Sequence, residues 1–126
     1  MIEDLHHVTI AVRDLERAKR FYGDILGLRE IERPGFDFSG AWYALGDRQL
    51  HLIVNEEAES LRDATHPDSR DGHYALRVSD WDATVEHLKA NGVEVLERRR
   101  NVTPWTQAYV ADPDGNVLEL NADRRG

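Results

Sequence analysis

The chain has 126 residues, no cysteine and a formal net charge of −8. Its length predicts about one domain with room for a core, so folding needs neither a disulfide nor a structural metal. The lack of cysteine excludes thiol nucleophiles, cysteine-based zinc sites and disulfide scaffolds, and it fits a reducing compartment. The acidic charge argues against a nucleic-acid partner, because such a chain repels phosphate backbones.

The start of the chain, Met1-Ile2-Glu3-Asp4, is acidic and runs directly into an apolar stretch. This pattern is unlike a secretory signal, which needs a basic region followed by an apolar one. No apolar run approaches the ~18 residues that a membrane-spanning helix requires. We therefore expect a cytoplasmic protein with no membrane partner.

The first half of the chain predicts a strand, a helix and three further strands. Asp14 is a suitable helix N-cap, apolar residues then recur at helical spacing, and Gly27 follows as a helix-ending residue. Gly46-Asp47 is typical of a turn between two strands. The expected elements are a strand over 5–12, a helix over 15–26, and strands over 28–32, 41–45 and 49–54.

The second half repeats this order. Ser79-Asp80-Trp81-Asp82 favours a capped helix start, and Asn91-Gly92 favours its end. Asp112-Pro113-Asp114-Gly115 is typical of a type I turn. The expected elements are a strand over 72–78, a helix from Trp81 to Asn91-Gly92, and strands over 93–96, 107–111 and 117–120.

Each half is thus expected to be a βαβββ module, which predicts an α+β fold. One such module of about 60 residues would leave a sheet face bare, so two modules must pair, within one chain or across a dimer. We expect a single domain over 1–126, with one module at about 1–55, a linker at about 56–71 and a second module at about 72–126. The paired modules would form a curled mixed sheet around a concave cavity.

Four polar residues fall at matching places in the two halves. His7 and His73 open similar strands 66 positions apart, and His51 and Glu119 lie in later strands 68 positions apart. One alternative is that these are ordinary polar residues on a solvated sheet face. Their repetition at equivalent places favours one shared site.

Strand alternation indicates which side these residues occupy, because successive side chains point to opposite faces. In the first strand Val8, Ile10 and Val12 form an apolar face expected to pack on the helices, which leaves His7 on the other. The same count places His51, His73 and Glu119 away from the helices. His6 falls on the packing face and is expected to be partly buried.

Imidazole and carboxylate ligands without thiolate suit Fe, Mn, Co, Ni or Zn as a divalent ion. A cation beside Glu119 would also offset the cost of burying its charge. The residues therefore predict one divalent metal ion at a site made of His7, His51, His73 and Glu119.

The chain resembles the vicinal oxygen chelate superfamily, which contains glyoxalase I, extradiol dioxygenases, fosfomycin-resistance proteins and bleomycin-resistance proteins. The resemblance covers nearly the whole chain and lies in several short motifs. They are His6-His7-Val8-Thr9-Ile10-Ala11-Val12, Asp14-Leu15, Phe21-Tyr22, Leu26-Gly27-Leu28, His73-Tyr74-Ala75-Leu76-Arg77-Val78 and Asp112-Pro113-Asp114-Gly115-Asn116 with Glu119.

This resemblance implies that His7, His73 and Glu119 bind the metal. His51 occupies the place from which some members draw another ligand, and it could instead be a base or support a ligand. Glyoxalase I proteins usually carry Glu at that place and extradiol dioxygenases leave it unligated, so His51 departs from both.

Other residues have two interpretations each. Tyr109 touches substrate or closes the edge of the core. Trp42 stacks on a planar substrate or belongs to the core, and Trp105 lies in a segment that often covers the cavity in this family. Arg77, on the same face as His73, binds a substrate anion or pairs with an acidic residue.

The resemblance implies a metal-dependent enzyme that acts on a small substrate with two neighbouring oxygens, either a glyoxalase-like lyase or isomerase or an extradiol-type dioxygenase. One alternative is a metal-free binding protein of the bleomycin-resistance type, although such proteins generally lack the full ligand set. Another is a fosfomycin-type transferase. The family also implies a homodimer, in which a cavity can combine modules of two chains.

Overall fold

The structure is a computed structural model that describes residues 1–124 and divides into two compact units. The first unit is Met1–Leu61 and the second begins at Arg62. Residues 62–71, expected to belong to a linker, are therefore part of the second unit. Within the described residues no helix is both long enough and apolar enough to cross a membrane.

The first unit is a four-stranded sheet with a helical segment after its first strand. Strand β1 lies parallel to β4, and β4–β3 and β3–β2 are antiparallel, which gives the order β1-β4-β3-β2. The elements are β1 (His7–Val12), α1 (Leu15–Lys19), η1 (Arg20–Ile25), β2 (Arg29–Ile31), β3 (Gly40–Leu45) and β4 (Arg48–Val54).

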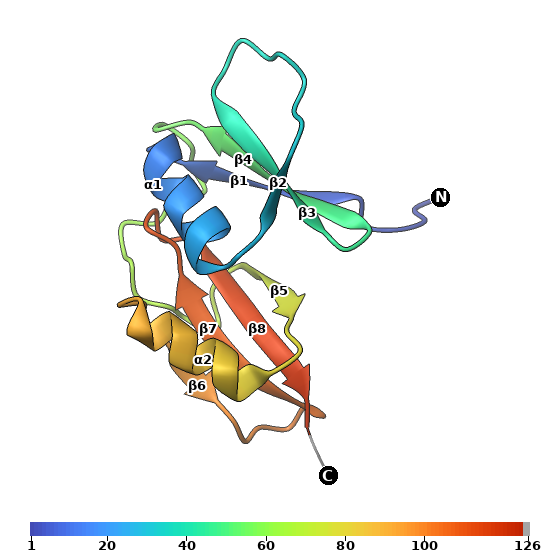
Figure 1. Ribbon diagram of the computed structural model, residues 1–126, viewed down its shortest axis with the longest axis vertical. Helices are drawn as coiled ribbons and strands as arrows, with labels where there is room; N and C mark the ends of the chain where they lie inside the picture. Colours follow the sequence, from blue (N-terminus) through green and yellow to red (C-terminus); the bar gives the residue numbers. More distant parts are fainter. Residues whose placement is uncertain (125–126) are drawn as a thin grey trace. The chain divides into compact units, whose positions relative to one another are not determined.

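The second unit repeats this topology, with the order β5-β8-β7-β6 and one parallel pair, β5–β8 (Figure 1). Its elements are β5 (His73–Arg77), α2 (Trp81–Ala90), β6 (Leu96–Arg98), β7 (Trp105–Ala111) and β8 (Val117–Asp123). The α+β fold built from two βαβββ modules is therefore confirmed.

Each unit buries the apolar face that strand alternation predicted. In the first unit Tyr22, from η1, and Tyr43, from β3, are fully buried with ring centroids 6.5 Å apart. In the second, α2 lies across one face of the sheet (Figure 1) and contacts β8, and Leu88 of α2 and Leu118 and Leu120 of β8 are all buried. The opposite face of each sheet carries the candidate ligands.

The expected strand over 93–96 was misplaced, because β6 begins only at Leu96. Gly92 has φ 76°, and the amides of Gly92 and Val93 donate to the carbonyls of Lys89 and Leu88. This is a Schellman ending. Because the Val93 amide is engaged in this helix ending, the pairing of β6 with β7 begins only at Leu96.

Two further expectations need correction. His6 is exposed, because β1 begins at His7 and the residue before it does not reach the packing face. The helix expected over 15–26 is α-helical only to Lys19 and then widens into a π-helical turn over η1. Asp14 does cap it, accepting from the Arg17 amide.

Gly40, where β3 enters the sheet, has no room for a side chain. A Cβ there would lie 2.3 Å from the Leu52 carbonyl oxygen. We expect Gly40→Ala to lower the free energy of unfolding by about 1–3 kcal/mol, because the backbone must shift. Gly35→Ala is the control, since a Cβ at Gly35 has no atom within 4 Å. Both changes stiffen the unfolded chain alike, so equal effects in urea denaturation would contradict the prediction.

Tyr43 is expected to make the protein sensitive to alkali. Burial raises the pKa of Tyr43 to about 12, and the carboxylates of Glu30, Asp24 and Glu16 contribute. An unfolded tyrosine loses its proton near pH 10. Stability is therefore complete below about pH 10 and falls as the pH rises towards 12, by about 2 kcal/mol from this group. Urea denaturation of wild type and Tyr43→Phe should give a shallower pH dependence in the variant, and parallel curves would exclude this origin.

Candidate functional site

In the first unit three of the singled-out residues form a stack of rings. The ring of His51 lies between those of Trp42, at 4.0 Å and 2° from parallel, and His7, at 4.1 Å and 21°. His51 is buried, whereas His7 is exposed.

Strand register explains why these three residues meet. Trp42 on β3 lies directly opposite His51 on β4. On the other side, Thr9 of β1 pairs with His51, and His7 stands two residues earlier on the same face. The small Thr9 lets the ring of His7 reach diagonally to His51.

His51 is held as a neutral ring. Burial lowers the pKa of His51, and the nearby His7, His6 and Arg33 lower it further. Its Nε2 lies 2.7 Å from Oε1 of Gln49. A neutral imidazole is the form that can bind a metal or accept a proton, so both roles expected for His51 suit this environment.

The second unit joins the other two candidate ligands. Nε2 of His73 lies 3.7 Å from Oε1 of Glu119. The register matches that of the first unit, because Ala75 pairs with Glu119 and His73 stands two residues before it. A small residue again lets the histidine reach across.

Glu119 is buried and surrounded by hydrogen-bond donors. Its Oε1 accepts from the Tyr109 hydroxyl at 2.9 Å and from Gln107 Nε2 at 3.1 Å, and its Oε2 accepts from Asn121 Nδ2 at 2.6 Å. Donors of this kind stabilise a buried carboxylate and fix its direction. Tyr109 lies opposite Glu119 in the sheet, as Trp42 lies opposite His51.

Tyr109 acts here as a fixed donor. Burial raises the pKa of Tyr109 to about 12, and its hydrogen bond to Glu119 contributes. The phenol therefore keeps its proton at neutral pH. Its ring also meets that of His73 edge-on, with centroids 5.3 Å apart.

His73 has one ring nitrogen engaged. Its Nδ1 donates to the Asp71 carbonyl oxygen at 2.8 Å, because a carbonyl can only accept; in the neutral ring this leaves the lone pair on Nε2, which faces Oε1 of Glu119. Histidine ligands of metals are commonly fixed in this way through their second nitrogen.

The donor set of the second unit fits a divalent ion. Two metal bonds of about 2.1 Å can span up to about 4.2 Å, which is more than the 3.7 Å between Nε2 of His73 and Oε1 of Glu119. Within residues 1–124 no three His, Asp or Glu side chains form a group that could hold a metal. The structure thus brings the candidates together as two pairs, one in each unit.

Arg77 and Trp105 lie together in the second unit, on the same sheet face as Glu119. Nη1 of Arg77 is 2.5 Å from Oδ1 of Asp123, and its guanidinium stands 5.9 Å from the Trp105 ring centroid. Trp105 opens β7 rather than lying in a covering loop. Its Nε1 is buried without a hydrogen-bond partner among the described residues.

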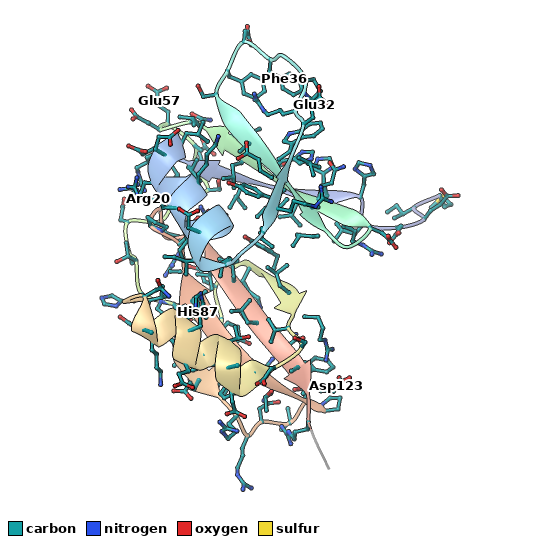
Figure 2. The ribbon with its side chains drawn as sticks, viewed as in Figure 1. Arg20, Glu32, Phe36, Glu57, His87 and Asp123 are labelled. Carbon is teal, nitrogen blue, oxygen red and sulfur yellow. The ribbon has the colours of Figure 1, made fainter. Side chains whose placement is uncertain are left out.

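Several residues of the site received no role from the sequence. Gln49 and Asn121 bond His51 and Glu119 two residues away on the same strand, and Gln107 bonds Glu119 from the neighbouring strand β7. In the loop before β3, Phe36 (labelled in Figure 2) and Phe38 stack at 5.0 Å, and both are exposed. The sequence signal that could have identified Phe36 and Phe38 is a pair of aromatic residues in a loop that contains Gly and Pro.

A double-mutant cycle would test the Tyr109–Glu119 bond in metal-free protein. We expect Tyr109→Phe to lower the free energy of unfolding by about 1–3 kcal/mol, because a charged acceptor loses a donor. In a Glu119→Gln background the same change should cost less, with a coupling energy of about 1 kcal/mol or more. Additive effects in urea denaturation would show that the two groups do not interact.

Comparison with known proteins adds to this geometry. Residues 4–120 match the model of the Glyoxalase/Bleomycin resistance protein/Dioxygenase superfamily. The chain is 30% identical over 122 residues to the metallothiol transferase FosB of Staphylococcus saprophyticus, covering 96% of this chain and 78% of FosB. It is 30% identical over 123 residues to the lactoylglutathione lyase of Haemophilus influenzae, covering 90% and 88%.

Solved structures share the fold. The fosfomycin resistance protein FosX from Listeria monocytogenes matches with a TM-score of 0.75 at 25% identity, covering 98% of this chain and 96% of FosX. A mutant of FosX from the same species was crystallised with Mn(II) and a dihydroxypropylphosphonic acid, and matches with a TM-score of 0.74 at 23% identity, covering 98% and 95%.

Proposed function

Because the chain belongs to the Glyoxalase/Bleomycin resistance protein/Dioxygenase superfamily, we propose that it is a divalent-metal-dependent enzyme acting on a small substrate with two neighbouring oxygens. His7, His73 and Glu119 hold the ion, and His51 is a fourth ligand or a base. The observation that carries the proposal is the pair in the second unit, where Nε2 of His73 faces Oε1 of Glu119 at 3.7 Å.

A site of this kind needs ligands that are directed before the ion binds. Glu119 accepts three side-chain hydrogen bonds and His73 is fixed through Nδ1, so neither must reorganise greatly. In the first unit, burial keeps His51 neutral. These features support a ligand set drawn from both units.

When bound, a divalent ion supplies Lewis-acid polarisation of the substrate oxygens. The protein's own residues bind and orient the substrate. Tyr109 keeps its phenolic proton and directs Glu119. His51, if it is not a ligand, is the neutral ring able to take a proton.

Arg77 and Trp105 are proposed to bind the substrate. The buried indole N–H of Trp105 lacks an acceptor within residues 1–124, so a substrate oxygen there would satisfy it. Arg77 can exchange its exposed partner Asp123 for a substrate anion at little cost, because exposed ion pairs contribute little. Trp42 presents the aromatic surface of the first unit, already stacked on His51.

Two reaction types are favoured by the relatives. The similarity to lactoylglutathione lyase supports a glyoxalase-like lyase or isomerase reaction, and the similarity to FosB and FosX supports addition of a nucleophile to an oxygen-containing ring, as in fosfomycin resistance. The His at position 51 differs from the Glu expected in glyoxalase I. Ring-cleaving dioxygenation, a homodimer and a cytoplasmic location stay predictions.

A metal-free binding protein is the second candidate, because Phe36 and Phe38 expose aromatic surface in a loop whose Phe36 ring lies 6.2 Å from that of Trp42. Such a protein would hold a ligand by stacking alone. Metal analysis distinguishes the two.

We expect protein purified without chelator to contain about one divalent ion per chain. Each proposed site combines one first unit with one second unit, and every chain supplies one of each. Glu119→Gln and His73→Ala should lower metal affinity at least about 100-fold, because each removes a ligand. His7→Ala should do the same. Elemental analysis and titration with Mn(II) or Zn(II) provide the measurement.

The control is His87→Ala, which changes an exposed histidine on α2 (Figure 2) and should leave affinity unchanged. His51→Ala separates its two roles, since a ligand is needed for affinity and a base only for turnover. Unchanged metal content in His7→Ala and Glu119→Gln, or no divalent metal in the wild type, would refute the proposed enzyme.

A further inference from the structure

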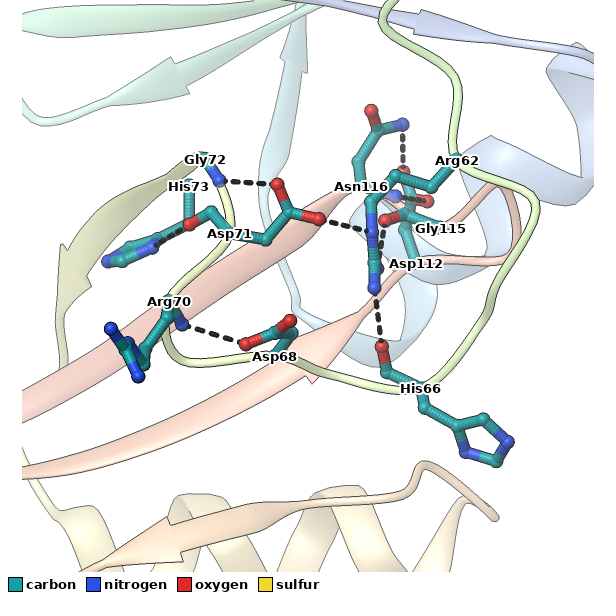
Figure 3. A network of polar contacts seen from close by, with 10 residues as sticks. All are labelled: Arg62, His66, Asp68, Arg70, Asp71, Gly72, His73, Asp112, Gly115 and Asn116. Carbon is teal, nitrogen blue, oxygen red and sulfur yellow. Dashed lines mark hydrogen bonds and ion pairs between the residues drawn. The ribbon is translucent and has the colours of Figure 1, made fainter.

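Arg62, the first residue of the second unit, binds three separate oxygen acceptors (Figure 3). Its Nη1 donates to the Gly115 carbonyl at 2.7 Å and its Nη2 to the His66 carbonyl at 3.1 Å. Its Nε lies 2.8 Å from Oδ2 of Asp71. The planar guanidinium thus fastens the segment before β5 at two points and joins it to the turn between β7 and β8.

That turn is itself closely fitted. Gly115 has φ 85°, and a Cβ there would lie 2.5 Å from the Ala64 carbonyl oxygen. Within the turn, Oδ1 of Asp112 accepts from the amides of Asp114 and Asn116 at 2.8 and 2.9 Å. The turn leads into β8, which carries Glu119.

Asp71 is the other end of the connection. Its carboxylate receives Arg62 on one oxygen and the Gly72 amide, at 2.8 Å, on the other. With the side chain fixed on both sides, the backbone carbonyl of Asp71 is directed at Nδ1 of His73, 2.8 Å away (Figure 3). Arg62 and His73 are therefore connected through one residue.

We propose that Arg62 is a positioning residue for the ligand pair of the second unit. By holding Asp71 it keeps His73 in the tautomer whose Nε2 lone pair faces Glu119. By holding Gly115 it also fixes the turn before the strand of Glu119. This inference rests on the proposed function, because a free Nε2 on His73 has a role only if an ion binds there.

A lysine cannot replace Arg62 fully. Its single ammonium is a point donor on a flexible stem, whereas the guanidinium presents donors in a rigid fork. Since the three acceptors come from different segments, a lysine would satisfy only part of them. The position therefore requires arginine for geometry and not for charge alone.

The first test measures the tautomer of His73 in metal-free protein by long-range ¹⁵N NMR, well above the ordinary imidazole pKa of about 6.5. The wild type should show Nδ1 protonated. Arg62→Met should shift the tautomer ratio about fivefold or more towards Nε2 protonation, as expected for a weakened hydrogen bond. Arg62→Lys should give a smaller shift and keeps the test informative if the methionine variant folds poorly.

Arg70→Met is the matched control, because it removes a guanidinium from the same exposed segment, in which Arg70 bonds Asp68 only through its backbone amide. It should leave the tautomer unchanged. A wild type with Nε2 protonated, a folded Arg62→Met with the wild-type tautomer, or an equal shift in Arg70→Met would overturn the proposal.

The second test measures Mn(II) affinity of the same variants. Loss of a residue that orients a ligand should weaken binding about 10–100-fold in Arg62→Met, with an intermediate loss in Arg62→Lys and none in Arg70→Met. Full rescue by lysine would overturn the geometric role. If no variant and no wild type bound metal, the proposed enzyme would fail, and the tautomer would still decide whether Arg62 positions His73.

Discussion

Each strand of this protein has two faces, and the helical segment of its unit covers one of them. The apolar residues of β4 and β8 must meet that helical side, so His51 and Glu119 are forced to the other. Parallel pairing then sets the histidine that opens β1 or β5 diagonally across from them. The small Thr9 and Ala75 between each pair leave room for this contact. The candidate chemistry follows from packing and register before any ligand is considered.

The two halves use this shared frame for different chemistry. The first surrounds His51 with the rings of Trp42 and His7 and keeps it neutral. The second surrounds the carboxylate of Glu119 with hydroxyl and amide donors. One half therefore offers neutral nitrogen, and the other offers nitrogen with a negative oxygen. Such nitrogen and oxygen donors are of the kinds that a borderline divalent ion prefers, and the joint four-residue site stays a proposal.

Alternation and turn residues were sufficient to predict both βαβββ modules and the faces of the candidate ligands. They failed where local geometry intervenes. The Schellman ending after α2 displaced β6, and His6 lay just outside β1. Two of the donors to Glu119, Tyr109 and Gln107, required the pairing of β7 with β8, which single-strand patterns do not contain. The role of Arg62 could not be predicted from the sequence, because its three acceptors come together only when the segment before β5 folds.

The two β-hairpins that carry the aromatic partners differ in their connections. Leu45 pairs with Arg48 across a two-residue turn, whereas Ala111 pairs with Val117 across a longer one. Trp42 nevertheless faces His51 just as Tyr109 faces Glu119. Which side chains face each other is set by the pairing of residues between the two strands and not by the length of the turn that connects them. A hairpin tip can therefore be lengthened or shortened in one unit without moving the candidate ligands, whereas a slip of one residue inside the ladder would turn them towards the core.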